Sequence, residues 1–152
     1  MPKTISLEEF RNCAGRELAP SDWLEITQER VNLFADATDD HQFIHIDPEK
    51  AATTPFGGTI AHGYLTLSLL ARLNRDSALL PEGMEMAINY GSNKVRFLAP
   101  VRVGNRIRSL QKILEVNQKN GLWLMKTAVT VEIEHGSKPA MKAEVLSMYI
   151  VK

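Results

Sequence analysis

Hydrophobic and polar positions alternate regularly in the C-terminal half of the chain. In "LWLMKTAVTVEIEH", one face of an extended strand would carry Trp123, Met125, Thr127, Val129, Val131 and Ile133, and the other face Lys126, Thr130, Glu132 and Glu134. A period of two is typical of an antiparallel strand with one buried face. "NRIRSLQKILEV" and "AMKAEVLSMYIVK" also favour strands, and "MEMAINYGSNKVRFLAP" indicates two strand-like pieces around Gly91. We therefore predict four or five long antiparallel strands within residues 85–152.

The N-terminal half, to about residue 80, reads as helical and irregular. Thr27 is a plausible N-cap for a helix ending near Ala37, because apolar positions then recur at helical spacing. A second helix, Ile60–Leu73, is apolar in nearly every direction, so we expect other structure to cover most of its surface. These elements predict an α+β architecture with a sheet around one buried helix. So few strands cover a helix incompletely, and we expect a homodimer in which a second copy completes the sheet.

Composition limits the classes of function. A chain of 152 residues has the size of one domain, and we expect a single domain spanning 1–152. It has 18 basic and 18 acidic side chains and no net charge. A neutral chain gives no support to nucleic-acid or membrane-surface binding, which usually show a basic excess. The N-terminus lacks a signal-peptide apolar core, and no apolar run approaches membrane-spanning length. We expect a cytoplasmic protein.

The stretch "TDDHQFIHIDP" gathers candidate chemistry, with two of the four histidines of the chain and three aspartates in residues 38–48. Asp40 and His45 lie on a segment expected to be irregular after the first helix. Gly63, in "GGTIAHGYL", lies near the start of the second helix. The first amides of a helix have no internal partners, and one beside glycine can hold a developing oxyanion. A carboxylate, an imidazole and such an amide are the parts needed to add or remove water beside a carbonyl.

Other interpretations of the same residues stay open. Asp39 or Asp40 is equally suited to capping a turn, and His45 to a core position with its ring nitrogens bonded to backbone. No spacing in the cluster matches a metal-ligand signature, so we predict no metal. "TLSLL" is not the strand-to-helix elbow of a hydrolytic serine. We expect Ser68 to be a buried hydroxyl bonded to the preceding helical turn or to a neighbouring polar side chain.

A family resemblance supplements this reasoning. "FADATDDHQFIHIDPEKAATTPFGGTIAHGYLTLSLL" closely resembles the signature of the MaoC-like dehydratases, the (R)-specific enoyl-CoA hydratases. The family pattern G-D-x-N-P-L/I-H-x-D, followed by A/V-H-G, corresponds to residues 39–47 and 61–63. "NYGSNKVRFLAPVRVGNRIR" resembles a second family block, and the likeness is strongest to the subgroup of nodulation protein N. Asp39, Gln42 and Phe43 depart from the pattern and leave the pocket shape open.

The resemblance implies a hot-dog fold, in which a curved antiparallel sheet wraps a long helix. It implies that Asp40 and His45 form a catalytic dyad and that the Gly63 amide receives the thioester oxygen. It assigns Ser68, which matches a helix serine supporting the dyad in some members, and His62 to the oxyanion and substrate-binding group. The implied reaction is hydration of trans-2-enoyl-CoA to (R)-3-hydroxyacyl-CoA. No cofactor is implied, because coenzyme A is part of the substrate.

Two alternative functions remain for a domain of this kind. A hot-dog acyl-CoA thioesterase generally needs a carboxylate on or near the central helix, and "HGYLTLSLLARL" has none. A non-catalytic acyl-CoA or acyl-carrier-protein binding module would need neither Asp40 nor His45. The phosphates of coenzyme A require a local basic patch, for which the candidates are Lys94, Arg96, Arg102, Arg106 and Arg108, although a solvated strand face explains any one of them equally well.

Overall fold

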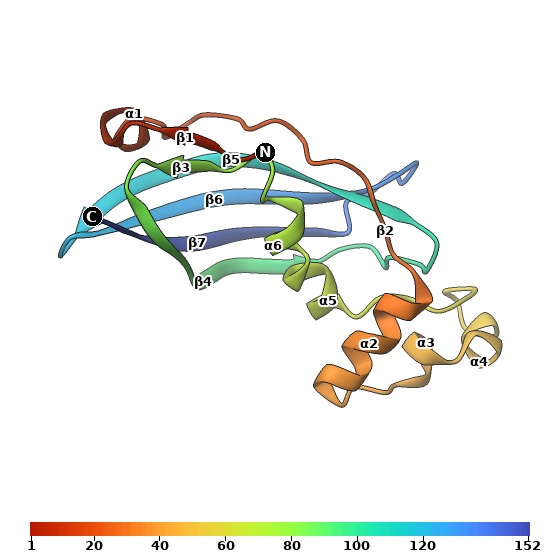
Figure 1. Cartoon of the computed structure of the whole chain (residues 1–152). Coiled ribbons are helices and arrows are strands. Elements are labelled where there is room, and N and C mark those ends of the chain that lie inside the picture. Colours follow the sequence, from red (N-terminus) through yellow and green to blue (C-terminus); the bar gives the residue numbers. More distant parts are fainter.

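A curled antiparallel sheet of five strands is the largest element of the computed structural model, which describes residues 1–152 (Figure 1). Its strand order is β2-β5-β6-β7-β4. The strands are β2 (Leu24–Glu25), β5 (Arg106–Lys119), β6 (Leu122–Ile133), β7 (Met141–Val151) and β4 (Met84–Phe97). In β6 every second residue from Trp123 to Val131 is buried, which confirms the predicted two-sided strand. The prediction of an α+β fold is confirmed.

Strand β4 differs from its prediction as two pieces around Gly91. It is one strand paired with β7, and its register shifts between Asn89 and Gly91. The irregularity at the glycine is therefore a bulge within a continuous strand, which turn residues in a sequence do not distinguish from a break. β4 is also an outer strand of the sheet, and nearly all its residues are exposed.

The two predicted helices are present with changes. Helix α2 (Gln28–Thr38) begins after Thr27, whose hydroxyl accepts a hydrogen bond from the Arg30 amide at 3.2 Å. The second helix is shorter than predicted and is divided into α5 (Gly63–Ser68) and α6 (Leu70–Leu73). Ile60 is not helical, because it pairs with Arg102 in an isolated β-bridge.

The covering of α5 and α6 is one-sided, which corrects the prediction of a helix wrapped on most of its surface. Leu65, Leu69, Leu70 and Leu73 are buried in a cluster that also holds side chains of α2 and of the sheet. Tyr64 and Ser68 lie on the opposite, exposed side. Within this single chain, the sheet therefore covers only one face of the helix.

Several short elements were not predicted. They are β1 (Lys3–Ile5), α1 (Leu7–Arg11), β2, α3 (Phe43–Ile46), α4 (Pro48–Ala52) and β3 (Leu79–Pro81), and β1 pairs with β3 in parallel. Figure 1 shows α2, α3 and α4 grouped at one end of the molecule, near the start of α5. No helix of the structure is long and apolar enough to cross a membrane. The cytoplasmic location stays a prediction.

Candidate active site

His45 is held in the interior by main-chain contacts. It lies on α3, a four-residue helix where an irregular segment was expected, and only 6% of its surface is exposed. Its Nδ1 lies 2.6 Å from the carbonyl oxygen of Ile60. A carbonyl oxygen only accepts hydrogen bonds, so Nδ1 carries the proton and a neutral His45 has its lone pair on Nε2.

Burial sets the charge state of His45. Its pKa lies below the ordinary value chiefly because desolvation disfavours the charged imidazolium, and His62 lowers it further. The hydrogen bond to Ile60 and the nearby Asp40 oppose this shift but do not cancel it. A neutral ring with a free Nε2 can accept a proton at neutral pH.

Asp40 approaches this histidine from a loop. Helix α2 ends at Thr38, and the next residue, Asp39, adopts a left-handed conformation with φ of 57°, so that the chain turns there toward α3. The Asp40 carboxylate is 52% exposed, and its Oδ1 accepts a 3.4 Å hydrogen bond from the Gln42 amide. It is therefore a solvent-accessible carboxylate beside a buried base.

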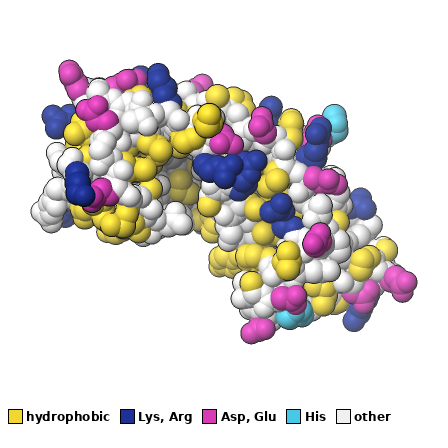
Figure 2. Space-filling view, in the orientation of Figure 1, with side chains coloured by type: hydrophobic (Ala, Val, Ile, Leu, Met, Phe, Trp, Pro, Cys, Tyr) yellow, Lys and Arg dark blue, Asp and Glu magenta, His cyan; other side chains and the backbone are white.

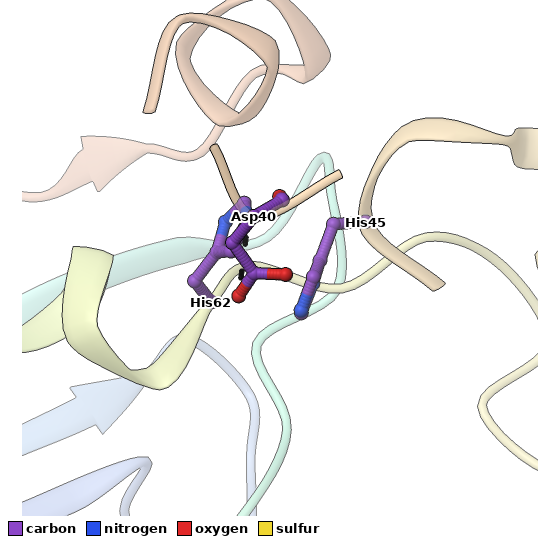
Figure 3. A group of neighbouring side chains, drawn as sticks. All are labelled: Asp40, His45 and His62. Carbon is purple, nitrogen blue, oxygen red and sulfur yellow. Dashed lines mark hydrogen bonds and ion pairs between the residues drawn. The ribbon is translucent and has the colours of Figure 1, made fainter. Parts of the chain in front are cut away.

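His62 contacts both Asp40 and His45. Its ring is 3% exposed, and Nε2 donates to the Asp40 carbonyl oxygen at 2.9 Å and lies 4.0 Å from Oδ2. The His45 and His62 rings stack with centroids 3.8 Å apart and 24° between their planes. Figure 3 shows the Asp40 carboxylate pointing toward both rings. One donor atom from each of the three side chains lies within 4.8 Å of the others.

The three side chains are close enough to be considered as metal ligands. One nitrogen of each ring is already bonded to a main-chain carbonyl oxygen. The His62 nitrogen that lies 4.0 Å from Asp40 Oδ2 is Nε2, which donates its proton to the Asp40 carbonyl oxygen and therefore offers no lone pair to a metal ion. The geometry favours an acid–base pair over a metal centre.

Gly63 occupies the first position of α5, directly after His62. A Cβ added there would lie 3.0 Å from the ring of Phe97, closer than real Cβ atoms normally approach a neighbour, so the position favours glycine. The first amides of a helix lack helical acceptors. A cavity of about 210 Å³ is bordered by Gly63, Thr66 and Phe97, so this helix end adjoins open space.

The structure does not bring Ser68 to the Asp40–His45 pair. Its hydroxyl donates to the Tyr64 carbonyl oxygen at 2.7 Å, as expected for a bond to the preceding turn, but the residue is exposed instead of buried. Ser68 lines a separate cavity of about 610 Å³ between α5–α6 and strands β4 and β7.

The candidate phosphate ligands are mostly engaged elsewhere. Lys94 pairs with Glu144 at 3.2 Å, Arg108 with Glu132 at 2.8 Å, and Arg106 with Glu134. Arg96 donates to the carbonyl oxygen of its neighbour Val95, and Arg102 donates to that of Gly57 at 2.8 Å. None of the five is drawn into the group of Asp40, His45 and His62.

Two residues that shape the site were not predicted from the sequence. Phe97 closes over Gly63, and Gln28 donates to the main-chain oxygen of His45 at 2.7 Å. Each lies far from its partner in the sequence, and neither belongs to a recognisable motif. Only the Gly63 position gave a signal, since a glycine at a helix start indicates close approach by some unspecified neighbour.

Comparison with known proteins places the chain in context. A family model described as "MaoC like domain" matches residues 9–136. The 3-hydroxyacyl-thioester dehydratase Z of Mycobacterium tuberculosis is 50% identical over 146 residues, 95% of this chain and 96% of that protein. Nodulation protein N of Rhizobium meliloti is 47% identical over 141 residues, 91% of this chain and 88% of that protein.

Solved structures support the same fold. An R-hydratase from Pseudomonas aeruginosa superposes with a TM-score of 0.74 at 28% identity, covering 91% of this chain and 83% of that one. An (R)-hydratase from A. caviae gives a TM-score of 0.68 at 24% identity, over 88% and 94% of the two chains. The hot-dog fold predicted from the resemblance is confirmed.

Proposed function

The chain belongs to the MaoC-like dehydratase family, and from that premise we propose that it is an (R)-specific enoyl-CoA hydratase. Its relatives are named as dehydratases and hydratases, and it is a hydro-lyase of this family. The reversible reaction proposed is addition of water to a trans-2-enoyl-CoA to give an (R)-3-hydroxyacyl-CoA. The observation that carries the proposal is the meeting of Asp40 with a buried, neutral His45 beside the helix end at Gly63.

In this mechanism Asp40 and His45 hold one water molecule between them. A water hydrogen-bonded at about 2.8 Å to each of two groups spans up to about 5.6 Å, and the groups here lie within 4.8 Å. As the water oxygen attacks C3 of the enoyl group, its proton passes to His45 Nε2 or to the carboxylate. The acquired proton is then returned to C2 on the same face of the substrate.

Charge must move onto the thioester oxygen between these two proton transfers. The Gly63 amide, at the start of α5, supports the proposal of an oxyanion site because it has no helical acceptor and borders a cavity. We assign His62 the role of holding Asp40, because it donates to the Asp40 main-chain oxygen. Both catalytic side chains are thus proposed to act opposite one helix terminus.

We place the acyl chain along α5. Ser68 lies five residues after Gly63, about 7.5 Å further along the helix axis. There it lines the cavity of about 610 Å³, with apolar neighbours such as Leu67 and Ala71. This placement makes Ser68 a substrate-lining residue and does not assign it a role in the dyad.

A homodimer is the proposed assembly. Strand β4 is a long sheet edge, and unprotected edges of this length pair readily with another chain. Its exposed large apolar side chains are Met86, Ile88, Tyr90 and Phe97. Figure 2 shows hydrophobic side chains exposed on the side where Figure 1 places β4 and α5. Light scattering at working concentration should give twice the chain mass, and a monomer would contradict the assembly.

The reaction itself is tested with crotonyl-CoA. We expect loss of enoyl absorbance and formation of (R)-3-hydroxybutyryl-CoA, identified by chiral chromatography. Thiol release detected with a disulfide dye, without hydroxyacyl product, would instead show a thioesterase. Tight binding with neither product would show a binding module. A series of enoyl chain lengths, on coenzyme A and on acyl-carrier protein, would define the natural substrate.

A further inference from the structure

Gln28, the first residue of α2, uses every polar atom of its side-chain amide. Its Nε2 donates to the His45 main-chain oxygen at 2.7 Å and to Asn32 Oδ1 at 2.9 Å. Its Oε1 accepts from the hydroxyl of Thr59 at 2.6 Å. A flipped amide would set oxygen against the carbonyl oxygen of His45, so the observed orientation is fixed by its partners.

His45 needs such support because α3 is very short. A helix of four residues has no stability of its own, and α3 has no side-chain cap. Its position relative to residues 59 and 60 rests on contacts with them. The Ile60 amide donates to the Ile44 carbonyl oxygen at 2.9 Å, and the His45 ring donates to the Ile60 carbonyl oxygen.

These hydrogen bonds and those of Gln28 form a closed loop of contacts. It runs from the His45 main chain through Gln28 to the buried Thr59, along the backbone to Ile60, and back to the His45 ring. Thr59 is itself tied down, since its carbonyl oxygen accepts from the Val103 amide at 2.9 Å. The acceptor of the Nδ1 proton therefore has a fixed place relative to the histidine that donates it.

We propose that Gln28 and Thr59 are positioning residues that keep His45 protonated on Nδ1, with Nε2 free to accept a proton. If the link between them is broken, the Ile60 carbonyl oxygen and the ring lose their alignment. The proton then distributes between the two nitrogens, and the Nε2–H form cannot take a proton from water. The consequence for turnover rests on the proposed function, but the consequence for the tautomer does not.

The test compares variants that break the link with variants that spare it. Gln28→Met and Thr59→Val remove the hydrogen bond from its two ends at similar side-chain size. Thr59→Ser retains the hydroxyl, and Asn32→Ala removes only the outer partner of the Gln28 amide. The readouts are kcat, KM and the ¹⁵N shifts of the His45 ring, assigned by comparison with His45→Gln and recorded near pH 8, where the ring is neutral.

We expect Gln28→Met and Thr59→Val to lower kcat by about 10-fold to 10²-fold with KM changed less than about threefold. Their His45 shifts should show a mixture of tautomers. Thr59→Ser and Asn32→Ala should retain the wild-type kcat and the Nδ1–H tautomer. If Gln28→Met is destabilised, Thr59→Val breaks the same hydrogen bond from the other end. The His45 tautomer measured in Thr59→Val then tests the inference.

Wild-type shifts and kcat in Thr59→Val would overturn the inference, as would equal losses in Asn32→Ala. A wild-type protein that hydrates no enoyl-CoA, while Thr59→Val still changes the tautomer, would reject the proposed function and leave the positioning role standing. A wild-type protein that hydrates enoyl-CoA, together with an unchanged His45 tautomer in Thr59→Val, would support the proposed function and reject the positioning role.

Discussion

His41 and His45 belong to one short stretch of sequence, yet their surroundings differ in every respect. His41 is 46% exposed and binds the Asp36 carboxylate at 2.8 Å, and this hydrogen bond raises its pKa. His45 is buried and binds a main-chain carbonyl oxygen, and burial lowers its pKa. The comparison shows that the partner and the solvent access of an imidazole decide whether it is suited to carry charge or to accept a proton.

The largest predicted difference is between removing each histidine. His45→Gln should lower kcat for crotonyl-CoA hydration by about 10²–10⁴-fold, because it removes the proposed general base. His41→Gln should stay within about twofold of wild type, since the side chain of His41 lies at the surface and is bonded to the exposed Asp36 carboxylate. Initial rates at saturating substrate test both. Equal losses of kcat in the two variants would contradict the different roles assigned to the two histidines.

A second substitution leaves both histidines intact and alters the opposite side of the site. Gly63→Ala places a methyl group against Phe97 and displaces the helix end, so we expect kcat to fall about 10-fold to 10²-fold. Gly63→Ala combined with Phe97→Leu makes room for the methyl group and should recover part of the loss. Unchanged kcat in Gly63→Ala would remove Gly63 from the proposed oxyanion site.

The pH dependence should follow the buried histidine. The pKa of His45 is lowered from 6.5, so the neutral, active form persists below that pH and is lost only as pH falls through the lowered pKa. Asp40 opposes the shift and His62 adds to it, and both face the ring. A profile of kcat/KM from about pH 4.5 to about pH 8 should be flat near neutrality with an acid limb below 6.5. An acid limb above that value would contradict a neutral buried base.

The smallest effect on activity is expected at the exposed pair of Asp36 and His41. Asp36→Asn removes the carboxylate that raises the pKa of His41, so that pKa should fall toward its ordinary value in an NMR titration. The kcat should not change, because neither group reaches Asp40 or His45. A loss of activity in Asp36→Asn would mean that the surface pair supports the site.

Regular helices and strands were predicted from the sequence better than the breaks, bulges and short helices that interrupt them. The alternation in β6 predicted its buried face, because successive side chains of a strand point to opposite faces and their polarity follows the burial of each face. The break at Leu69, the bulge at Gly91 and the helix α3 depend on tertiary contacts that have no period. The one-sided covering of α5 was missed for the same reason.

The site residues were predictable to different degrees. Asp40, His45 and Gly63 were selected by chemistry and by a resemblance, and the structure brings Asp40 and His45 together close to the start of α5. Gln28 and Thr59 were not selected, since their partners are main-chain atoms or lie far away in sequence. Ser68 was selected by resemblance, yet its hydroxyl bonds to its own helix.

The most direct measurement is a double-mutant cycle on crotonyl-CoA hydration with Asp40→Asn, His45→Gln and the combined variant. Two groups that hold one water act as a unit, so each single variant should be slow and the combined variant within about threefold of the slower one. Losses that multiply, or single variants as fast as wild type, would show that the carboxylate and the imidazole do not share a water in catalysis.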